Sequence, residues 1–233
     1  MSPYDNPSID IFGLRVDEPI TVFTDLIVAA IGIYAFYKTK SHTTKKYILY
    51  YRYFFLLTGI STLIGGLIGH AFAYSLGPNA KYPGWIVAIA GVVFAQFAVL
   101  FHTREAIGEW FFSKLFILNI LEIVAALVLL IIYKSFAIVE IHTAFGLVLI
   151  VSALEGINYS KTKSVLSKNI ILGVGFAIVG VSILVFKVAL SKWFNHKDIS
   201  HLFIALSLFL MYKGLITEQN RSANNTVNKN SIV

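Results

Sequence analysis

The sequence predicts an all-α protein: a bundle of seven transmembrane helices with its N-terminus outside and its C-terminus inside. Three observations lead to this prediction. Hydrophobic residues make up 57% of the 233 residues and charged residues only 13%, whereas soluble domains average roughly 45–50% and 25%. Apolar runs recur along the whole chain, and lysine and arginine are distributed unevenly between the segments that connect them.

The apolar runs predict where each helix lies. A transmembrane helix needs about 20 mainly apolar residues, whereas the strands of a membrane β-barrel are about ten residues of alternating polarity. The runs here are long and continuous, and charged or Gly/Pro-containing segments separate them. Only Lys134 and Ser135 separate the fourth run from the fifth. The runs are Ile20–Tyr37, Ile48–Tyr74, Gly84–Phe101, Phe112–Tyr133, Phe136–Leu154, Asn169–Leu190 and Ile199–Leu215.

The orientation follows from lysine and arginine, because cytoplasmic loops retain these residues. An outside N-terminus places twelve of them in the inner segments and five in the outer ones. The same asymmetry accounts for the net charge of +7, so we expect membrane lipid and no nucleic acid as partner. We expect residues 1–216 to form the helical domain and residues 217–233 a disordered polar cytoplasmic tail. The absence of cysteine excludes disulfides, thiolate metal sites and cysteine nucleophiles.

Ionisable residues gather near the outer ends of four predicted helices. Such a residue costs about 2.5–3.5 kcal/mol at the centre of a membrane helix, so each one indicates a functional site. Glu18, Thr21 and Asp25 are spaced i, i+3, i+7, which places three oxygen-bearing side chains on one face of the first helix. The other residues at this level are His70 on the second helix, Glu140 and His142 on the fifth, and His196, Asp198 and His201 on the seventh.

The second and seventh helices add polar positions around these residues. His70 ends a stripe of small and polar residues in the second helix, consisting of Thr58, Thr62, Gly65, Gly66, Gly69 and His70. Its glycines allow a neighbouring backbone to approach closely. Asp198 and His201 are spaced i, i+3 and can reach a common point. Asp198 also fits the first-turn acid of a helix, where free N–H groups favour a carboxylate, and this role does not exclude ligation.

Histidines and carboxylates in such an arrangement suit a zinc ion. Neutral imidazole nitrogen and carboxylate oxygen are its usual ligands, and a catalytic site keeps one position for water. The expected metal ligands are His70, His201 and His142, with Glu18, Thr21 and Thr62 in support. Asp25 and Asp198 are the candidate general bases. The second nitrogen of each ligating histidine needs an acceptor, a role open to Asp25, Glu18 or Asp198.

Four further polar residues fall outside this outer level. Asn119 and Glu122 lie near the middle of the fourth helix, where they can bond to a neighbouring helix or reach the outer residues through a deep cavity. His102 is interpreted as an ordinary boundary residue and Glu155 as an interfacial one.

Seven helices, an outside N-terminus, His70 on the second helix and an acid and histidine on the seventh resemble the CREST superfamily, which includes alkaline ceramidases and progestin and adiponectin receptor proteins. The resemblance covers nearly the whole chain in helix count. It implies a zinc site with His70 and His201 as ligands and, as in several members, hydrolysis of a lipid amide. Glu18 and Asp25 loosely resemble the acidic, calcium-associated first-helix segment of the ceramidases.

The sequence departs from that pattern in three places. The family carries two histidines four apart on the seventh helix, whereas His196 and His201 are five apart, so their directions differ by about 140°. Ser61 precedes His70 by nine residues, roughly 13 Å, instead of about one turn, and we expect it to face elsewhere. The third helix has no aspartate, so a third ligand must come from Asp198, His142 or an acid of the first helix.

Two functions from different classes account for these residues. The first is a zinc-dependent hydrolase of a lipid or amide at the outer membrane face. The alternative is a proton-coupled transporter or a receptor that uses the same acids and histidines without metal. The segments Glu18–Asp25 and Asn195–His201 are also similar to uncharacterised bacterial membrane proteins. We therefore expect the protein in the bacterial inner (plasma) membrane.

Overall fold

Seven long apolar helices form the bundle in the computed structural model, which describes residues 7–39 and 45–230. Each of the seven has the length and hydropathy needed to cross a membrane, which confirms the all-α class and the number of membrane-compatible helices. Their ranges are Pro19–Lys38, Lys46–Ala71, Asn79–Ile107, Glu109–Tyr133, Phe136–Thr162, Val165–Val185 and His196–Arg221.

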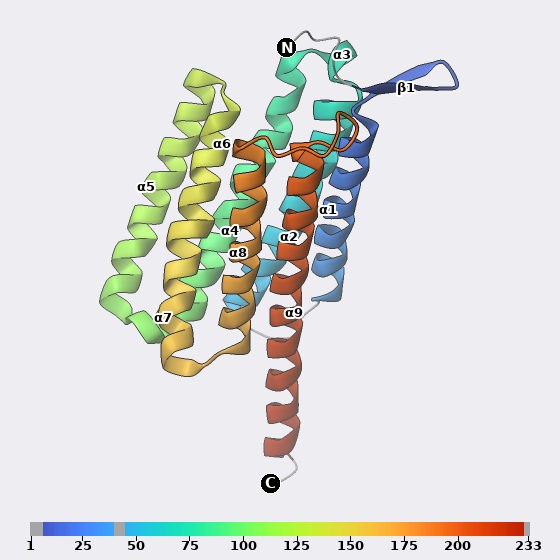
Figure 1. The fold of residues 1–233 in the computed structure, drawn as a ribbon. Coiled ribbons are helices and arrows are strands. Elements are labelled where there is room, and N and C mark those ends of the chain that lie inside the picture. The colour runs from blue at the N-terminus through green and yellow to red at the C-terminus, as the bar shows by residue number, and fades with distance from the viewer. Residues whose placement is uncertain (1–6, 40–44, 231–233) are drawn as a thin grey trace.

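Several of these helices consist of more than one element. The helical elements are α1 (Pro19–Lys38), α2 (Lys46–Ile64), η1 (Gly65–Ala71), α3 (Ala73–Leu76), η2 (Pro78–Lys81), α4 (Tyr82–Ile107), α5 (Glu109–Tyr133), α6 (Phe136–Thr143), η3 (Ala144–Val151), α7 (Ser152–Thr162), α8 (Val165–Val185) and α9 (His196–Asn230). Figure 1 shows the long helices side by side, with the two chain termini at opposite ends of the bundle.

A β-hairpin that was not predicted from the sequence precedes the first helix. β1 (Ser8–Ile11) pairs antiparallel with β2 (Leu14–Asp17). Phe12 and Gly13 form its two-residue turn with φ of 53° and 82°, as a twisted hairpin of this type requires. The hairpin extends sideways from the top of the bundle in Figure 1. We call this end of the bundle the hairpin end.

Local sequence explains where the helices begin and end. Pro19 occupies the first turn of α1, where its missing N–H is not needed. Lys134 leaves the helical conformation with φ of 48°, and the Ser135 hydroxyl then accepts a hydrogen bond from the Ala137 N–H at 3.3 Å. The predicted break between the fourth and fifth helices is thereby confirmed. The sixth helix ends at Val185, before the predicted Leu190, because Lys187 adopts a left-handed conformation.

Two of the long helices contain a π-helical segment, and both segments adjoin a buried or half-buried histidine. η1 contains His70, and η3 begins directly after His142 and Thr143. Such widened turns are rare, and they are frequent at functional sites. In η1, Gly65, Gly66 and Gly69 weaken the preference for a regular α-helix, so the backbone can adopt the wider turn that orients His70.

The packing brings the N-terminal and C-terminal helices together. α1 lies against α2, η1 and α9, and α9 also packs along α8. α4 contacts α2, α5, α6, η3 and α7. α5 lies at the edge of the bundle in Figure 1, and only a small share of its apolar stretch is buried. Residues from α1, η1 and α9 therefore meet at the hairpin end.

The last helix extends beyond its predicted end at Leu215. α9 is continuous from His196 to Asn230. Two contacts link the start of this extension to the rest of the bundle. The Gln219 amide donates to the Thr39 carbonyl at 3.0 Å, and Glu218 lies 3.9 Å from the Lys45 ammonium.

Candidate functional site

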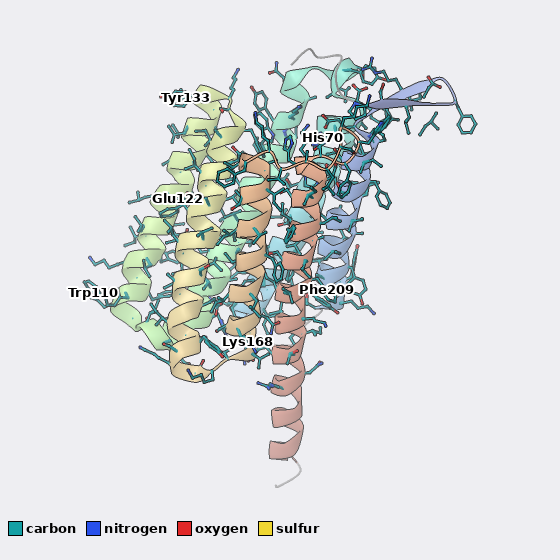
Figure 2. All side chains as sticks on the ribbon, viewed as in Figure 1. His70, Trp110, Glu122, Tyr133, Lys168 and Phe209 are labelled. Atoms are coloured by element: carbon teal, nitrogen blue, oxygen red, sulfur yellow. The ribbon has the colours of Figure 1, made fainter. Side chains whose placement is uncertain are left out.

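Acids, histidines and a lysine from three elements converge at the hairpin end. Glu18 and Asp25 come from the start of α1, His70 from η1, and Lys197 and His201 from the first turns of α9. We call these five residues the acid–histidine cluster. The two acids are almost completely buried, whereas the side chains of His70 and His201 are 21% and 17% exposed. Figure 2 shows the position of His70 near this end of the bundle.

Glu18 binds two cationic or hydrogen-bonding partners at once. Its carboxylate lies 2.5 Å from His70 Nδ1 and accepts hydrogen bonds from the Lys197 ammonium at 2.7 and 2.9 Å. Burial raises the pKa of Glu18, but the bonds and charges of His70 and Lys197 outweigh it and lower that pKa from 4.5 to about 2. Glu18 is therefore ionised at neutral pH and accepts the Nδ1 proton of His70. In the neutral imidazole, Nε2 of His70 then has a free lone pair.

The hydrogen bonds of Thr24 fix the second histidine in the same way. The Thr24 hydroxyl donates its one proton to the Thr21 carbonyl at 3.0 Å. It also lies 3.0 Å from His201 Nδ1, so it accepts the proton that Nδ1 carries. In the neutral imidazole, Nε2 of His201 then has a free lone pair.

Both free nitrogens face the same carboxylate. Nε2 of His201 lies 3.4 Å from Asp25 Oδ1, and Nε2 of His70 lies 3.8 Å from Asp25 Oδ2. Asp25 Oδ2 is buried and has no hydrogen-bond partner. Each imidazole nitrogen therefore approaches an oxygen of the Asp25 carboxylate without a donor between the two acceptors. An added cation or proton would stabilise such an arrangement.

Asp25 packs against Gly66, where a larger residue would not fit. A Cβ atom at this position would lie 2.9 Å from Cβ of Asp25, closer than two side-chain carbons can approach. The stripe of small residues in the second helix thus allows Asp25 to lie against η1, as the sequence pattern indicated.

Asp198 lies beside the cluster and has a structural role of its own. It accepts a hydrogen bond from the Thr21 hydroxyl at 2.6 Å and another from the Asn195 backbone N–H at 2.6 Å. The Asn195 side chain in turn accepts from the Lys197 backbone N–H at 2.9 Å. These reciprocal bonds form a capping box at the start of α9. Both oxygens of Asp198 are thus occupied, as expected for a first-turn acid.

The structure does not bring His142 into the cluster. Its Nδ1 lies 2.6 Å from Glu122 Oε1 on α5, and its Nε2 lies 3.3 Å from the Ile89 carbonyl on α4. Gln96 donates to the other oxygen of Glu122 at 3.4 Å. Figure 2 shows Glu122 near the middle of α5, away from His70. Glu122, His142 and Gln96 thus form a second polar group between α4, α5 and α6, whereas the side chain of Asn119 is buried without a hydrogen-bond partner among the described residues.

Thr62, which was predicted to support the site, and Ser61 both form hydrogen bonds elsewhere. The Thr62 hydroxyl donates to the carbonyls of Thr58 and Gly59 in its own helix, at 3.0 and 3.2 Å. The Ser61 hydroxyl donates to the Gly84 carbonyl of α4 at 3.0 Å. Ser61 therefore faces away from His70, as its spacing predicted.

A third polar group at the opposite end of the bundle escaped the sequence reading. Glu155 is completely buried, and its carboxylate accepts hydrogen bonds from the Tyr51 hydroxyl at 2.8 Å and from His102 Nδ1 at 2.9 Å. Interpreting Glu155 as interfacial and His102 as an ordinary boundary residue was therefore wrong. Tyr51 needs a partner for its hydroxyl when it is buried, but no local pattern in the sequence marks that burial.

The lowered pKa of Glu18 predicts how stability depends on pH. A carboxyl group whose folded-state pKa is depressed contributes its full stabilisation above its ordinary pKa and loses it as the pH falls through the folded-state value. For Glu18 this window runs from pH 4.5 down to about 2. We expect Glu18→Gln to lower the melting temperature at pH 7, and the difference from the wild type to shrink as the pH falls through this window.

Thermal unfolding in detergent between pH 7 and pH 3 measures this effect. Glu140→Gln removes an exposed acid of α6 and serves as the control, with no comparable change expected. A constant difference between the wild type and Glu18→Gln across the whole pH range would contradict the assigned role of Glu18.

Within the described residues, no group of three or more His, Cys, Asp or Glu side chains has a geometry that could hold a metal ion. A family model described as a family of unknown function (DUF6962) matches residues 20–220. No curated protein and no solved structure matches the chain.

Proposed function

This chain belongs to DUF6962, a family of unknown function, and we propose that it is a membrane-integral hydrolase that binds zinc at the acid–histidine cluster. The twelve-to-five distribution of lysine and arginine supports an outside N-terminus and an inside C-terminus. The cluster then faces the outer side of the membrane, which we take to be a bacterial plasma membrane. The resemblance of His70 and His201 to CREST ligands supports the same proposal.

The orientation of the two imidazoles towards Asp25 is the observation that carries the proposal. Two neutral histidines and one carboxylate, with a further position open to water, are a ligand set of catalytic zinc sites. Ligand atoms around a tetrahedral zinc lie about 3.3 Å apart, given bonds of roughly 2.0–2.1 Å, and Nε2 of His201 lies 3.4 Å from Asp25 Oδ1. Glu18 on Nδ1 of His70 is the carboxylate partner that orients zinc-bound histidines.

The chemistry assigned to each residue follows from these contacts. Zinc bound here would polarise a carbonyl group and lower the pKa of a water molecule. His70, His201 and Asp25 Oδ1 would hold the ion, and Asp25 Oδ2, which has no other partner, would accept the proton of the attacking water. Asp198 has no part in this step, because both of its oxygens already accept hydrogen bonds. Because both histidines are partly exposed, an amide or ester group of a lipid could reach them.

A specific observation favours the second candidate function. The described residues contain no group already gathered around a metal position, whereas Lys197, Glu18, His70, Asp25 and His201 follow one another in a chain of contacts no longer than 3.8 Å. Such a chain can hold and pass a proton. A proton-coupled transporter or a receptor is therefore the alternative.

Metal analysis of the purified protein tests the proposal. We expect about one zinc per chain in the wild type and loss of zinc in His70→Ala and in His201→Ala. The control His196→Ala should retain zinc, because His196 is the first residue of α9 and is not part of the cluster. The zinc-loaded wild type should then release fatty acid from a panel of lipid amides and esters. Folded, monodisperse wild type that stays free of metal after zinc is supplied would overturn the proposal and favour the proton-coupled alternative.

A further inference from the structure

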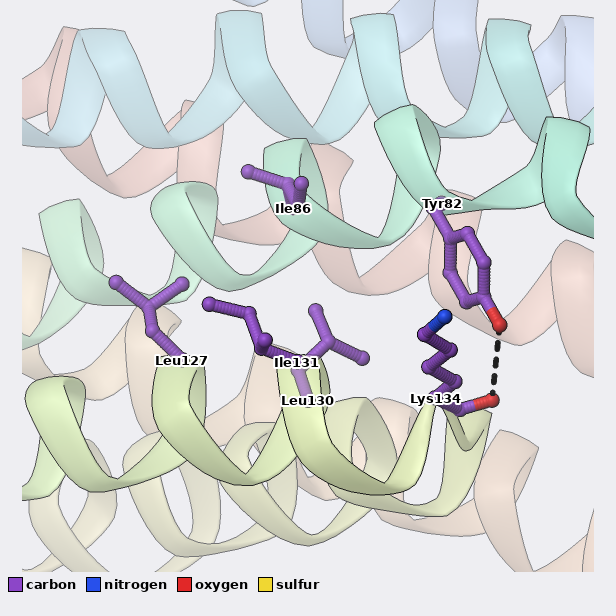
Figure 3. A pocket seen from close by; sticks show the side chains of 6 residues that line it. All are labelled: Tyr82, Ile86, Leu127, Leu130, Ile131 and Lys134. Carbon is purple, nitrogen blue, oxygen red and sulfur yellow. Dashed lines mark hydrogen bonds between the residues drawn. The ribbon is translucent and has the colours of Figure 1, made fainter.

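An apolar groove lies between α4 and α5 at the hairpin end, separate from the acid–histidine cluster. Its volume is about 280 Å³, larger than the roughly 150 Å³ cavities that take up a benzene ring. Leu130 is buried at its floor, and Ile86 and Ile131 are exposed along it. Figure 3 shows the groove with Tyr82 and Lys134 together at one end. The lining residues are Tyr82, Ile86, Leu127, Leu130, Ile131 and Lys134.

Lys134 is the charged group of this groove. Among the described residues it forms no ion pair, and its side chain is exposed. Its backbone conformation is fixed, because it ends α5 with φ of 48°, and its carbonyl lies 3.5 Å from the Tyr82 hydroxyl. The end of an otherwise apolar groove therefore carries a single positive charge.

The surroundings of Lys134 indicate the depth of this end in a membrane. The ring centroids of Tyr82 and Trp85 lie 5.0 Å apart, and those of Trp85 and Phe136 lie 5.5 Å apart. Tyrosine and tryptophan concentrate at the level of the lipid headgroups. From Leu127 to Lys134 the α5 backbone rises about 10 Å at 1.5 Å per residue. The apolar part of the groove thus extends from headgroup level into the hydrocarbon layer.

We propose that this groove binds one acyl chain of an anionic phospholipid, with the lipid phosphate on the Lys134 ammonium. The apolar walls match the chain, and the charge of Lys134 matches the headgroup. The exposed side chains of Ile86 and Ile131 lie along the groove, and α5 lies at the edge of the bundle. The groove is therefore accessible from the surrounding leaflet, so a phospholipid fits it better than a soluble ligand does. The proposal is independent of zinc and hydrolysis.

Trp85 offers a reporter for this lipid, since it packs against the cluster of Ile89, Leu130 and Val139 beside the groove. Trp110→Phe and Trp193→Phe leave Trp85 as the only tryptophan. This background variant is reconstituted in phosphatidylcholine vesicles that contain increasing fractions of dibrominated phosphatidylglycerol or dibrominated phosphatidylcholine. We expect the brominated anionic lipid to quench Trp85 fluorescence at lower mole fractions than the zwitterionic one.

Variants of the lining residues make the test decisive. Lys134→Gln should raise the mole fraction of phosphatidylglycerol for half-maximal quenching about fivefold, the factor that corresponds to the roughly 1 kcal/mol of one lysine near anionic lipid. Lys192→Gln removes the same charge from the connection between α8 and α9 and should leave the preference intact. Leu127→Phe should fill the groove and reduce quenching by both lipids.

Three results would overturn the proposal. These are equal quenching by the two lipids in the background variant, an unchanged preference in Lys134→Gln, and quenching by a brominated free fatty acid without quenching by brominated phosphatidylglycerol.

Discussion

Asp25→Asn is expected to abolish the proposed zinc binding and hydrolysis and, at the same time, to raise the melting temperature of the protein. Asp25 is 3% exposed, and its Oδ2 has no hydrogen-bond partner. A buried carboxylate without a partner costs free energy. The amide has nearly the same shape, carries no charge, and its N–H group can donate to Nε2 of His70 or His201. We expect a gain of about 1–3 kcal/mol in stability and a loss of at least about a hundredfold in activity.

Asp198→Asn is the matched control, since Asp198 is also a buried acid at the hairpin end. Both of its oxygens accept hydrogen bonds, from Thr21 and from Asn195. Replacing one acceptor by a donor breaks a bond at the start of α9, so this variant should lower the melting temperature by the loss of about 1 kcal/mol of capping. Thermal unfolding and activity of the two variants are measured side by side in detergent. We expect the melting temperature to rise in Asp25→Asn and to fall in Asp198→Asn. A decrease in both would show that Asp25 has a structural role.

The helices followed from the sequence because the signal for each is local. About 20 apolar residues in a row predict a membrane helix wherever its neighbours lie, and Lys134 and Ser135 were enough to mark the break between the fourth and fifth helices. The hairpin lacked its usual signal: Phe12 occupies a turn position with φ of 53°, where Asn or Gly is expected. The π-helical turn of η1 was also missed, since i→i+5 bonding has no simple sequence pattern.

The sequence predicted how far along each helix the candidate site residues lie, but not which neighbouring helix each residue faces. The positions of Glu18, Asp25, His70 and His201 along their helices placed them at one level, and the structure brings these four together. His142 lies on a face that meets Glu122, because α6 packs against α4 and α5. Which face of a helix meets which neighbour depends on contacts between residues far apart in the chain. The buried Glu155 bonds Tyr51 and His102 of two other helices, so its burial had no local signal.

Gly32→Leu is expected to disrupt the bundle itself, because α1 and α2 touch through their backbones at this point. A Cβ atom at position 32 would lie 2.6 Å from the Phe55 carbonyl oxygen and 3.0 Å from the Gly59 Cα atom. Backbone cannot move aside as a flexible side chain can, so α1 must shift away from α2. The shift would separate Glu18 and Asp25 on α1 from His70 on η1. We expect a loss of about 3 kcal/mol or more, at the upper end of overpacking effects.

Gly175→Leu provides the control for the same change in side chain. Gly175 is exposed on α8, and a Cβ atom there would meet nothing within 4 Å. Leucine is also the better helix former, so Gly175→Leu should be neutral or slightly stabilising. The yield of monodisperse protein and its melting temperature in detergent compare the two variants, and zinc content should fall only in Gly32→Leu. The close contact between α1 and α2 places Glu18 and Asp25 opposite His70. Equal stability of both glycine variants would therefore mean that the cluster does not depend on this contact.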